Sequence, residues 1–122
     1  MTKKMLENDQ RTIKEALQDS KFELEESLVG VTNATTRAQI NAEIDRHRDE
    51  IRRIRRKEID DGVDALLANP TFQADLAIIR KGAQEAKKLA QEVARATNKL
   101  QAAAKLISKL ATPLEKLVGF LT

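Results

Sequence analysis

The apolar side chains between Phe72 and Ile107 recur in alternating steps of four and three residues. The full set is Phe72, Leu76, Ile79, Ala83, Ala86, Ala90, Val93, Thr97, Leu100, Ala104 and Ile107, of which only Thr97 is polar. This spacing places every member on one side of an α-helix, as in a coiled coil. It therefore predicts one helix over residues 71–111, roughly 60 Å long, that pairs with another helix along its seam.

Glycine and proline divide the chain into four predicted helices, because both residues occur at helix ends. The predicted helices span residues 6–29, 34–68, 71–111 and 113–121. Gly30 can supply the left-handed residue that follows the first helix. Pro70 separates the second helix from the third, since the residue before a proline resists the helical conformation. Pro113, preceded by Thr112, is suited to the first position of the short fourth helix.

The second helix has two candidate starting points. Thr36 and Gln39 have the spacing of a capping box, in which each side chain satisfies a free backbone N–H of the first turn. Asn33 is the alternative, because asparagine is also a favoured N-cap. Either start leaves a polar turn after the first helix.

The apolar seams of the second and third helices match when the chain is folded back at Pro70. Val63 then lies opposite Leu76, and Ile40 lies opposite Leu100. The predicted fold is therefore all-α, a single helical domain over residues 1–122 built on a long antiparallel, coiled-coil-like hairpin. The shorter N-terminal helix is expected to pack antiparallel on the second helix, and the short C-terminal helix completes the domain.

The chain lacks the residues that most catalytic and cofactor sites require. It has no cysteine, a single histidine and no glycine-rich loop, which removes thiolate chemistry, Cys/His metal sites and phosphate loops. We expect a non-enzymatic protein without a cofactor, a metal or a small-molecule substrate. His47 lies between Ile44 and Ile51 on the apolar seam. It is interpreted as a partly buried seam residue, and the alternative of a ligand or general base lacks companion residues.

Neither an export signal nor a membrane span is visible. The N-terminal residues are charged where a signal peptide needs an apolar region. No uncharged stretch approaches the roughly 18 to 20 residues that a transmembrane helix needs. We expect a cytoplasmic location.

The strongest local charge lies in residues 46–57, which hold seven basic side chains and two acidic ones. One interpretation is a surface that binds the phosphates of nucleic acid, or other anions, without sequence preference. Its candidate residues are Arg48, Arg52, Arg53, Arg55 and Arg56. No aromatic side chain is interspersed to stack on bases.

The other interpretation of this basic stretch is a solvated helix with local ion pairs. Arg46 and Glu50 are four residues apart, as are Asp49 and Arg53, and such pairs stabilise helices. The charge balance favours this second interpretation, because residues 31–69 contain eight basic and eight acidic side chains.

The C-terminal segment has more large apolar side chains than the predicted hairpin seam can cover. The candidate interface residues are Leu106, Leu110, Leu114, Leu117, Phe120 and Leu121. The segment can fold back over the bundle, dock into a groove of a partner protein, or lie on a membrane surface with nearby lysines beside its apolar face. All three explanations remain open at this level.

The sequence as a whole predicts a helical protein-protein interaction or oligomerisation module, such as an adaptor, chaperone-like or scaffold subunit. A protein partner or a homo-oligomer is expected, because a rod two or three helices thick leaves apolar edges exposed. One alternative is a membrane-active helical protein that uses the C-terminal segment. The other is nonspecific binding of nucleic acid or another anion through residues 46–57.

Overall fold

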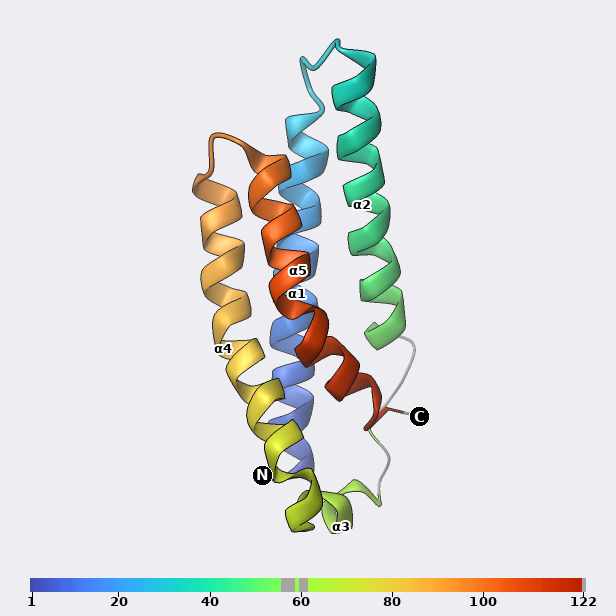
Figure 1. Cartoon of the computed structure of the whole chain (residues 1–122), viewed down its shortest axis with the longest axis vertical. Coiled ribbons are helices and arrows are strands. Elements are labelled where there is room, and N and C mark those ends of the chain that lie inside the picture. The colour runs from blue at the N-terminus through green and yellow to red at the C-terminus, as the bar shows by residue number, and fades with distance from the viewer. Residues whose placement is uncertain (56–58, 60–61, 122) are drawn as a thin grey trace.

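Four long helices form the body of the molecule. The structure is a computed structural model, and it describes residues 1–55, 59 and 62–121. The elements are α1 (Lys3–Ser27), α2 (Ala34–Arg55), α3 (Val63–Leu67), η1 (Pro70–Phe72, a 3-10 turn), α4 (Gln73–Arg95) and α5 (Lys99–Val118). Figure 1 shows the long helices side by side in an elongated bundle, with α3 at one end. Within the described ranges no strand occurs, and the prediction of an all-α fold is confirmed.

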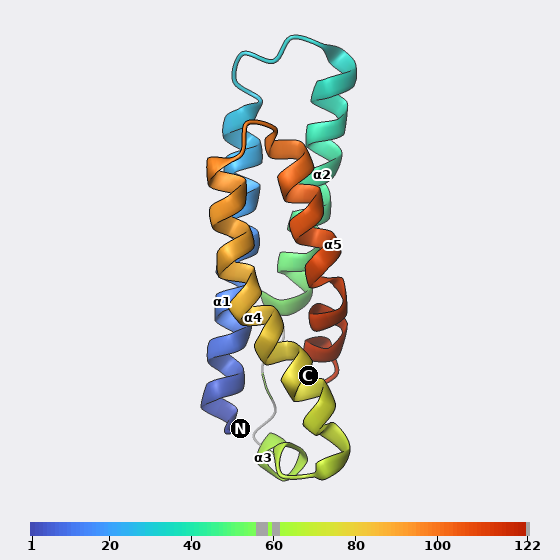
Figure 2. The ribbon, with the colours of Figure 1, turned by 60° about the vertical axis from the view of Figure 1, so that its left-hand side comes forward.

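The bundle consists of two antiparallel hairpins packed against each other. α1 packs on α2 and α4 packs on α5, and both turns lie at the same end of the molecule (Figures 1 and 2). α1 also packs on α4, and α2 packs on α5. Consequently α1 and α4 run in the same direction. The prediction that the first helix packs antiparallel on the second is confirmed.

The predicted long hairpin between the second and third helices is wrong. α2 packs on α1 and α5 instead of lying along α4. The two seams that match about Pro70 therefore do not meet, although α4 does bury its predicted stripe from Leu76 to Val93. The seam of α4 is covered by α1 and α5, and that arrangement requires the chain to turn back after Arg95.

The predicted helix over residues 71–111 is interrupted by a turn at Ala96, Thr97 and Asn98. The side chain of Asn98 caps α5 by accepting a hydrogen bond from the backbone N–H of Gln101 at 3.0 Å. The Lys99 ammonium donates to the carbonyl of Val93 at 2.9 Å and also to the carbonyl of Ala94, which satisfies the C-terminal end of α4. These polar caps offset the helical hydrogen bonds lost at the turn.

The predicted short helix over residues 113–121 is the last part of α5 and not a separate element. α5 continues through Pro113, and the chain leaves the helix after Val118. Pro113 faces Gly82 of α4: a Cβ atom on Gly82 would lie 2.5 Å from Cγ of Pro113 and closer still to its Cβ. The proline therefore fits inside the bundle because α4 presents no side chain there.

The second helix is shorter than the predicted range of 34–68. α2 ends at Arg55, α3 is a separate five-residue helix, and residues 56–58, 60 and 61 lie outside the described part of the chain. At its start Asn33 is the cap, since its Oδ1 accepts a hydrogen bond from the N–H of Thr36 at 2.9 Å. The capping box at Thr36 is therefore not the start, because Thr36 is already inside α2. Gly30 has the expected positive φ, 84°.

Candidate functional site

The six C-terminal residues predicted as an interface lie in the core of the monomer. Leu106, Leu110 and Leu117 are completely buried, and Phe120 and Leu121 are less than one tenth exposed. Leu114 is buried as well. Phe120 packs edge to face on Phe72, with ring centroids 5.8 Å apart, and Leu121 forms an isolated β-bridge with Ile59. The segment thus folds back over the bundle, and these six side chains do not form an exposed surface.

The basic residues of α2 point to more than one side of the helix. Arg53 donates to Glu115 of α5 at 2.7 Å and to Glu50 at 3.1 Å, and the bond to Glu115 raises the pKa of Arg53. Arg48 pairs with Asp45 at 3.4 Å. The predicted pairs four residues apart are replaced by pairs three residues apart.

Arg52 and Arg55 remain exposed on α2, and they share a face with Arg48 by their spacing. Arg56, the fifth candidate, lies outside the described residues. The four described arginines therefore do not form one surface, because Arg53 pairs with α5 whereas Arg48, Arg52 and Arg55 share another face of α2.

His47 joins α2 to α1 through a buried polar contact. Its Nε2 lies 2.7 Å from Oγ of Ser20, and its Nδ1 lies 2.8 Å from the backbone carbonyl of Glu43. A neutral imidazole with its proton on Nδ1 satisfies both contacts, because Nδ1–H donates to the carbonyl and Nε2 accepts from the serine hydroxyl. The pKa of His47 is lowered to about 4, mainly by burial and to a smaller extent by the nearby charges of Arg46 and Lys21, while the backbone hydrogen bond to Glu43 opposes the shift.

The Ser20 and His47 pair has the distance of a nucleophile and its base, but neither side chain is exposed at all. A substrate would have to open α1 from α2 to reach the hydroxyl. The carboxylate of Glu43 is also buried and accepts from Arg46 at 2.6 Å. We therefore interpret this cluster as a polar clasp in the core, more deeply buried than the sequence predicts.

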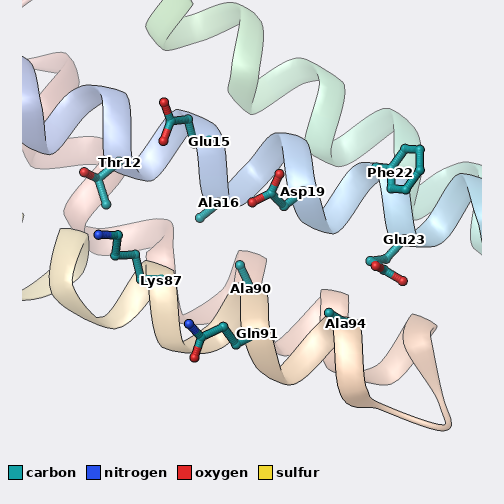
Figure 3. A pocket seen from close by; sticks show the side chains of 10 residues that line it. All are labelled: Thr12, Glu15, Ala16, Asp19, Phe22, Glu23, Lys87, Ala90, Gln91 and Ala94. Atoms are coloured by element: carbon teal, nitrogen blue, oxygen red, sulfur yellow. The ribbon is translucent and has the colours of Figure 1, made fainter.

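A groove of about 410 Å³ runs between the parallel helices α1 and α4. Its lining residues are Thr12, Glu15, Ala16, Asp19, Phe22, Glu23, Lys87, Ala90, Gln91 and Ala94. Figure 3 shows Ala16 and Ala90 between the two helices, Thr12 and Lys87 at one end, and Phe22 and Ala94 toward the other. Alanine side chains at the contact are small enough to let the helix backbones approach closely. They are also apolar, and they form the floor of the groove.

Phe22 is the most exposed aromatic side chain in the described structure, with 58% of its surface accessible. The two other phenylalanines, Phe72 and Phe120, pack on each other. Phe22 was missed in the sequence because it lies off the Leu17 and Leu24 stripe. The sequence signal that indicates it is a large aromatic ring among charged residues. Such a ring on a solvated helix face does not contribute to the core, so it indicates a contact surface.

The two walls of the groove carry opposite charge. Glu15 and Asp19 on α1 are exposed and form no ion pair among the described residues, whereas Glu23 pairs with Lys99 at 3.2 Å. Among the lining residues on α4 the cation is Lys87, which is exposed and has no ion pair within the described residues. The groove therefore combines an apolar floor, an acidic wall and a basic wall.

Two further features are absent from the described part of the chain. No group of three or more His, Cys, Asp or Glu side chains there is placed to hold a metal ion. None of the helices described is both long enough and apolar enough to cross a bilayer. In comparisons with known proteins, no family model, no curated protein and no solved structure matches this chain.

Proposed function

We propose that this protein is a non-enzymatic helical interaction module that pairs with a second copy of itself along the groove between α1 and α4. The observation that carries the proposal is the exposure of Phe22 beside an alanine-lined groove. A phenyl ring left in water forgoes roughly 1.5 to 3 kcal/mol of hydrophobic stabilisation. Contact with another apolar surface recovers that free energy.

The charges of the groove favour a second copy as the occupant. Glu15 and Asp19 lie on the α1 wall and Lys87 lies on the α4 wall. A two-fold axis parallel to the groove sets α1 of one copy over α4 of the other at the same height. The two facing helices are then parallel, because α1 and α4 run in the same direction. The acidic wall of each copy then faces the basic wall of its partner, as an isologous contact requires.

The shape of the groove supports the same pairing. In this arrangement Phe22 of one copy lies over the α4 wall of the other, where Ala90 and Ala94 leave room for a ring. Each copy thus supplies both a projecting ring and a surface of small residues. Aromatic side chains at the centre of an interface contribute most of its binding energy.

We expect a weak dimer, because the contact rests on one groove of about 410 Å³ and one exposed ring. Stable interfaces bury about 800 Å² per partner, and smaller ones belong to transient complexes. We expect a dissociation constant in the range of roughly 10 to 100 μM, equivalent to about −7 to −5 kcal/mol. Such a dimer forms and separates with the local concentration of the protein.

The test is the solution mass measured by sedimentation equilibrium over a wide concentration range. Wild-type protein should rise from monomer to dimer mass, and Phe22→Asp should remain monomeric because its charge cannot be buried there. Val29→Asp is the matched control: Val29 is 81% exposed in the turn after α1, outside the groove. It should dimerise like wild type.

A charge exchange tests the orientation of the two copies. Glu15→Lys/Asp19→Lys on the α1 wall and Lys87→Glu on the α4 wall should each weaken the dimer. The triple variant should restore it, because the two walls then carry reversed but still opposite charges. A wild-type chain that stays monomeric up to about 1 mM overturns the homodimer. In that event the occupant of the groove is a helix of a different protein.

A further inference from the structure

A second pocket, of about 460 Å³, lies between the N-terminal half of α1 and the end of α2. Its described lining residues are Lys3, Glu7, Asn8, Gln10, Arg11, Lys14, Ile54, Arg55 and Ile59. None of these residues lines the groove between α1 and α4, so the pocket is separate from the surface of the proposed dimer. Its volume falls within the usual range for small-ligand sites.

The cations of this pocket come from one face of α1 and from the end of α2. Lys3, Glu7, Arg11 and Lys14 follow one another at steps of four, four and three residues, which aligns them along the helix. Arg55 is contributed by α2. The amide of Gln10 donates to the carbonyl of Ile54 at 2.6 Å and thereby fixes the end of α2 against α1.

Positive charge dominates the described lining of the pocket. Its described lining holds four cations, Lys3, Arg11, Lys14 and Arg55, against one carboxylate, Glu7, a net charge of +3. Glu7 pairs with Lys3 at 3.8 Å. Lys14 and Arg55 have no ion pair with any carboxylate in the described part of the chain.

Two of the polar groups in the pocket are held in position. Arg11 donates to the side chain of Asn8 at 2.8 Å, which restricts its guanidinium. Lys3 is anchored at its backbone N–H, which donates to Asp64 at 3.2 Å. A guanidinium that is already held in position loses less conformational entropy when an anion binds.

We propose that this pocket binds a short polyphosphate chain, either free or as the phosphate part of a nucleotide. Several cations on two helices match an anion that carries several linked phosphate groups better than one that carries a single group. Arginine recognises phosphate oxygens with paired N–H donors, and lysine adds a point charge. No aromatic side chain lines the described part of the pocket, so nothing there selects a base.

The pocket differs from the anion surface expected from the sequence. Of the candidates on α2, only Arg55 lies in it, and its other cations belong to the first helix. These α1 residues were not candidates because the first 30 residues are acidic overall, with five basic and seven acidic side chains. The fold separates them, placing Lys3, Arg11 and Lys14 in this pocket and Glu15 and Asp19 in the groove.

The probe for the test is inorganic tripolyphosphate, titrated by calorimetry into the full-length protein at low salt and at physiological salt. Wild-type protein should bind one equivalent, and affinity should fall as salt rises. The variant Lys14→Gln/Arg55→Gln should bind at least about tenfold more weakly, a loss consistent with two charge-assisted contacts. Both side chains project from helix surfaces, and circular dichroism will confirm that the variant is folded.

The matched control is Lys81→Gln/Lys88→Gln, which removes the same charge from exposed positions on α4. It should bind like wild type, within about twofold. An equal loss in both variants overturns the proposal, because binding then follows the net charge alone. Orthophosphate that binds as tightly as tripolyphosphate overturns the assignment to a chain of phosphates, and wild-type protein that binds neither at low salt overturns the site.

ATP and duplex DNA, added as competitors, distinguish the sources of the phosphate. Displacement of tripolyphosphate by ATP at comparable concentration supports a nucleotide as one source of the chain. Displacement by duplex DNA alone, with ATP ineffective, overturns the proposal in favour of a nucleic-acid surface.

Discussion

Pro113 of α5 fills the space in which Gly82 of α4 would carry a side chain. This close contact lies inside α4 and inside α5. Glycine and proline are both poor residues for a helix interior. Their unfavourable effect on helix stability is offset here, because Gly82 leaves space that the ring of Pro113 fills.

Gly82→Ala should destabilise the protein, although alanine favours a helix by about 1 kcal/mol over glycine. The added methyl group overlaps a rigid proline ring, and overpacking of this kind costs typically about 1 to 3 kcal/mol. Urea unfolding measures the change. The double variant Gly82→Ala/Pro113→Gly should recover part of the loss, and strictly additive effects of the two substitutions would contradict the contact.

Stability should fall as the pH drops from about 6.5 to about 4 because of His47. The pKa of His47 is lowered from 6.5 to about 4 in the folded state. Between these values the unfolded chain binds the proton and the folded chain does not, so acid favours unfolding. The stabilising contribution is present in full above pH 6.5 and amounts to about 3 kcal/mol.

The variant Ser20→Ala/His47→Leu isolates this effect, because it replaces both members of the clasp by apolar groups. Its free energy of unfolding, measured at each pH, should lack the decline that wild type shows in that window. The carboxylates titrate in both proteins and cancel in the comparison. Parallel pH profiles for wild type and variant would show that His47 is not the group responsible.

Asn98→Ala should lower stability by about 1 kcal/mol, the usual effect of losing an N-cap side chain. The hydrogen bond from Gln101 N–H to Asn98 would be lost. Thermal unfolding detects the change as a lower midpoint. Asn41→Ala is the control, since Asn41 is exposed within α2 and should be neutral or slightly stabilising as alanine. Equal effects at both positions would argue against a capping role.

Leu117→Ala should cost about 2 to 5 kcal/mol of stability, as expected for a leucine in a core. Leu117 is completely buried within the monomer. Denaturant unfolding at low protein concentration measures this loss without a contribution from association. Phe22→Ser is the contrasting change, expected to shift monomer stability by less than about 0.5 kcal/mol. If Phe22→Ser destabilised the monomer more than Leu117→Ala, the C-terminal segment would again be a candidate interface.

The fold class and much of the helix content follow from apolar spacing alone. The stripe from Leu76 to Val93 is buried as predicted, because within one helix the side-chain period fixes which residues share a face. The antiparallel contact between the first two helices follows from the short turn at Gly30. These are local relationships, and local relationships are what a sequence pattern records.

The pairing of helices is where the prediction failed. The four-three spacing continues through Thr97 into Leu100 and Ala104, so the pattern alone does not show that the chain turns back. In the structure α5 buries Ala103 and Leu106 in place of Leu100 and Ala104, whereas Ile107 of the predicted seam is buried. The signals for the turn are the capping residues Asn98 and Lys99. Two capping residues are a weaker signal than an apolar spacing that continues from Phe72 to Ile107.

The candidate sites were harder to predict than the fold. A surface formed by two helices depends on which helices are neighbours, and the wrong hairpin placed α4 beside α2 instead of α1. Phe22 and Lys87 are distant in sequence and share a groove only through that neighbour relation. The burial of Leu106 and Leu110 likewise depends on α5 folding back, which the predicted continuous rod does not allow.

The turn at Ala96, Thr97 and Asn98 has a consequence for how copies of the chain can interlock. If those three residues were removed, α4 and α5 would fuse into one straight rod, and α5 could no longer reach its own bundle. Its leucines would then be covered only by the equivalent helices of another molecule, which is domain swapping. The three-residue turn thus allows the chain to fold as a monomer, whereas a chain without it would fold only as a domain-swapped dimer.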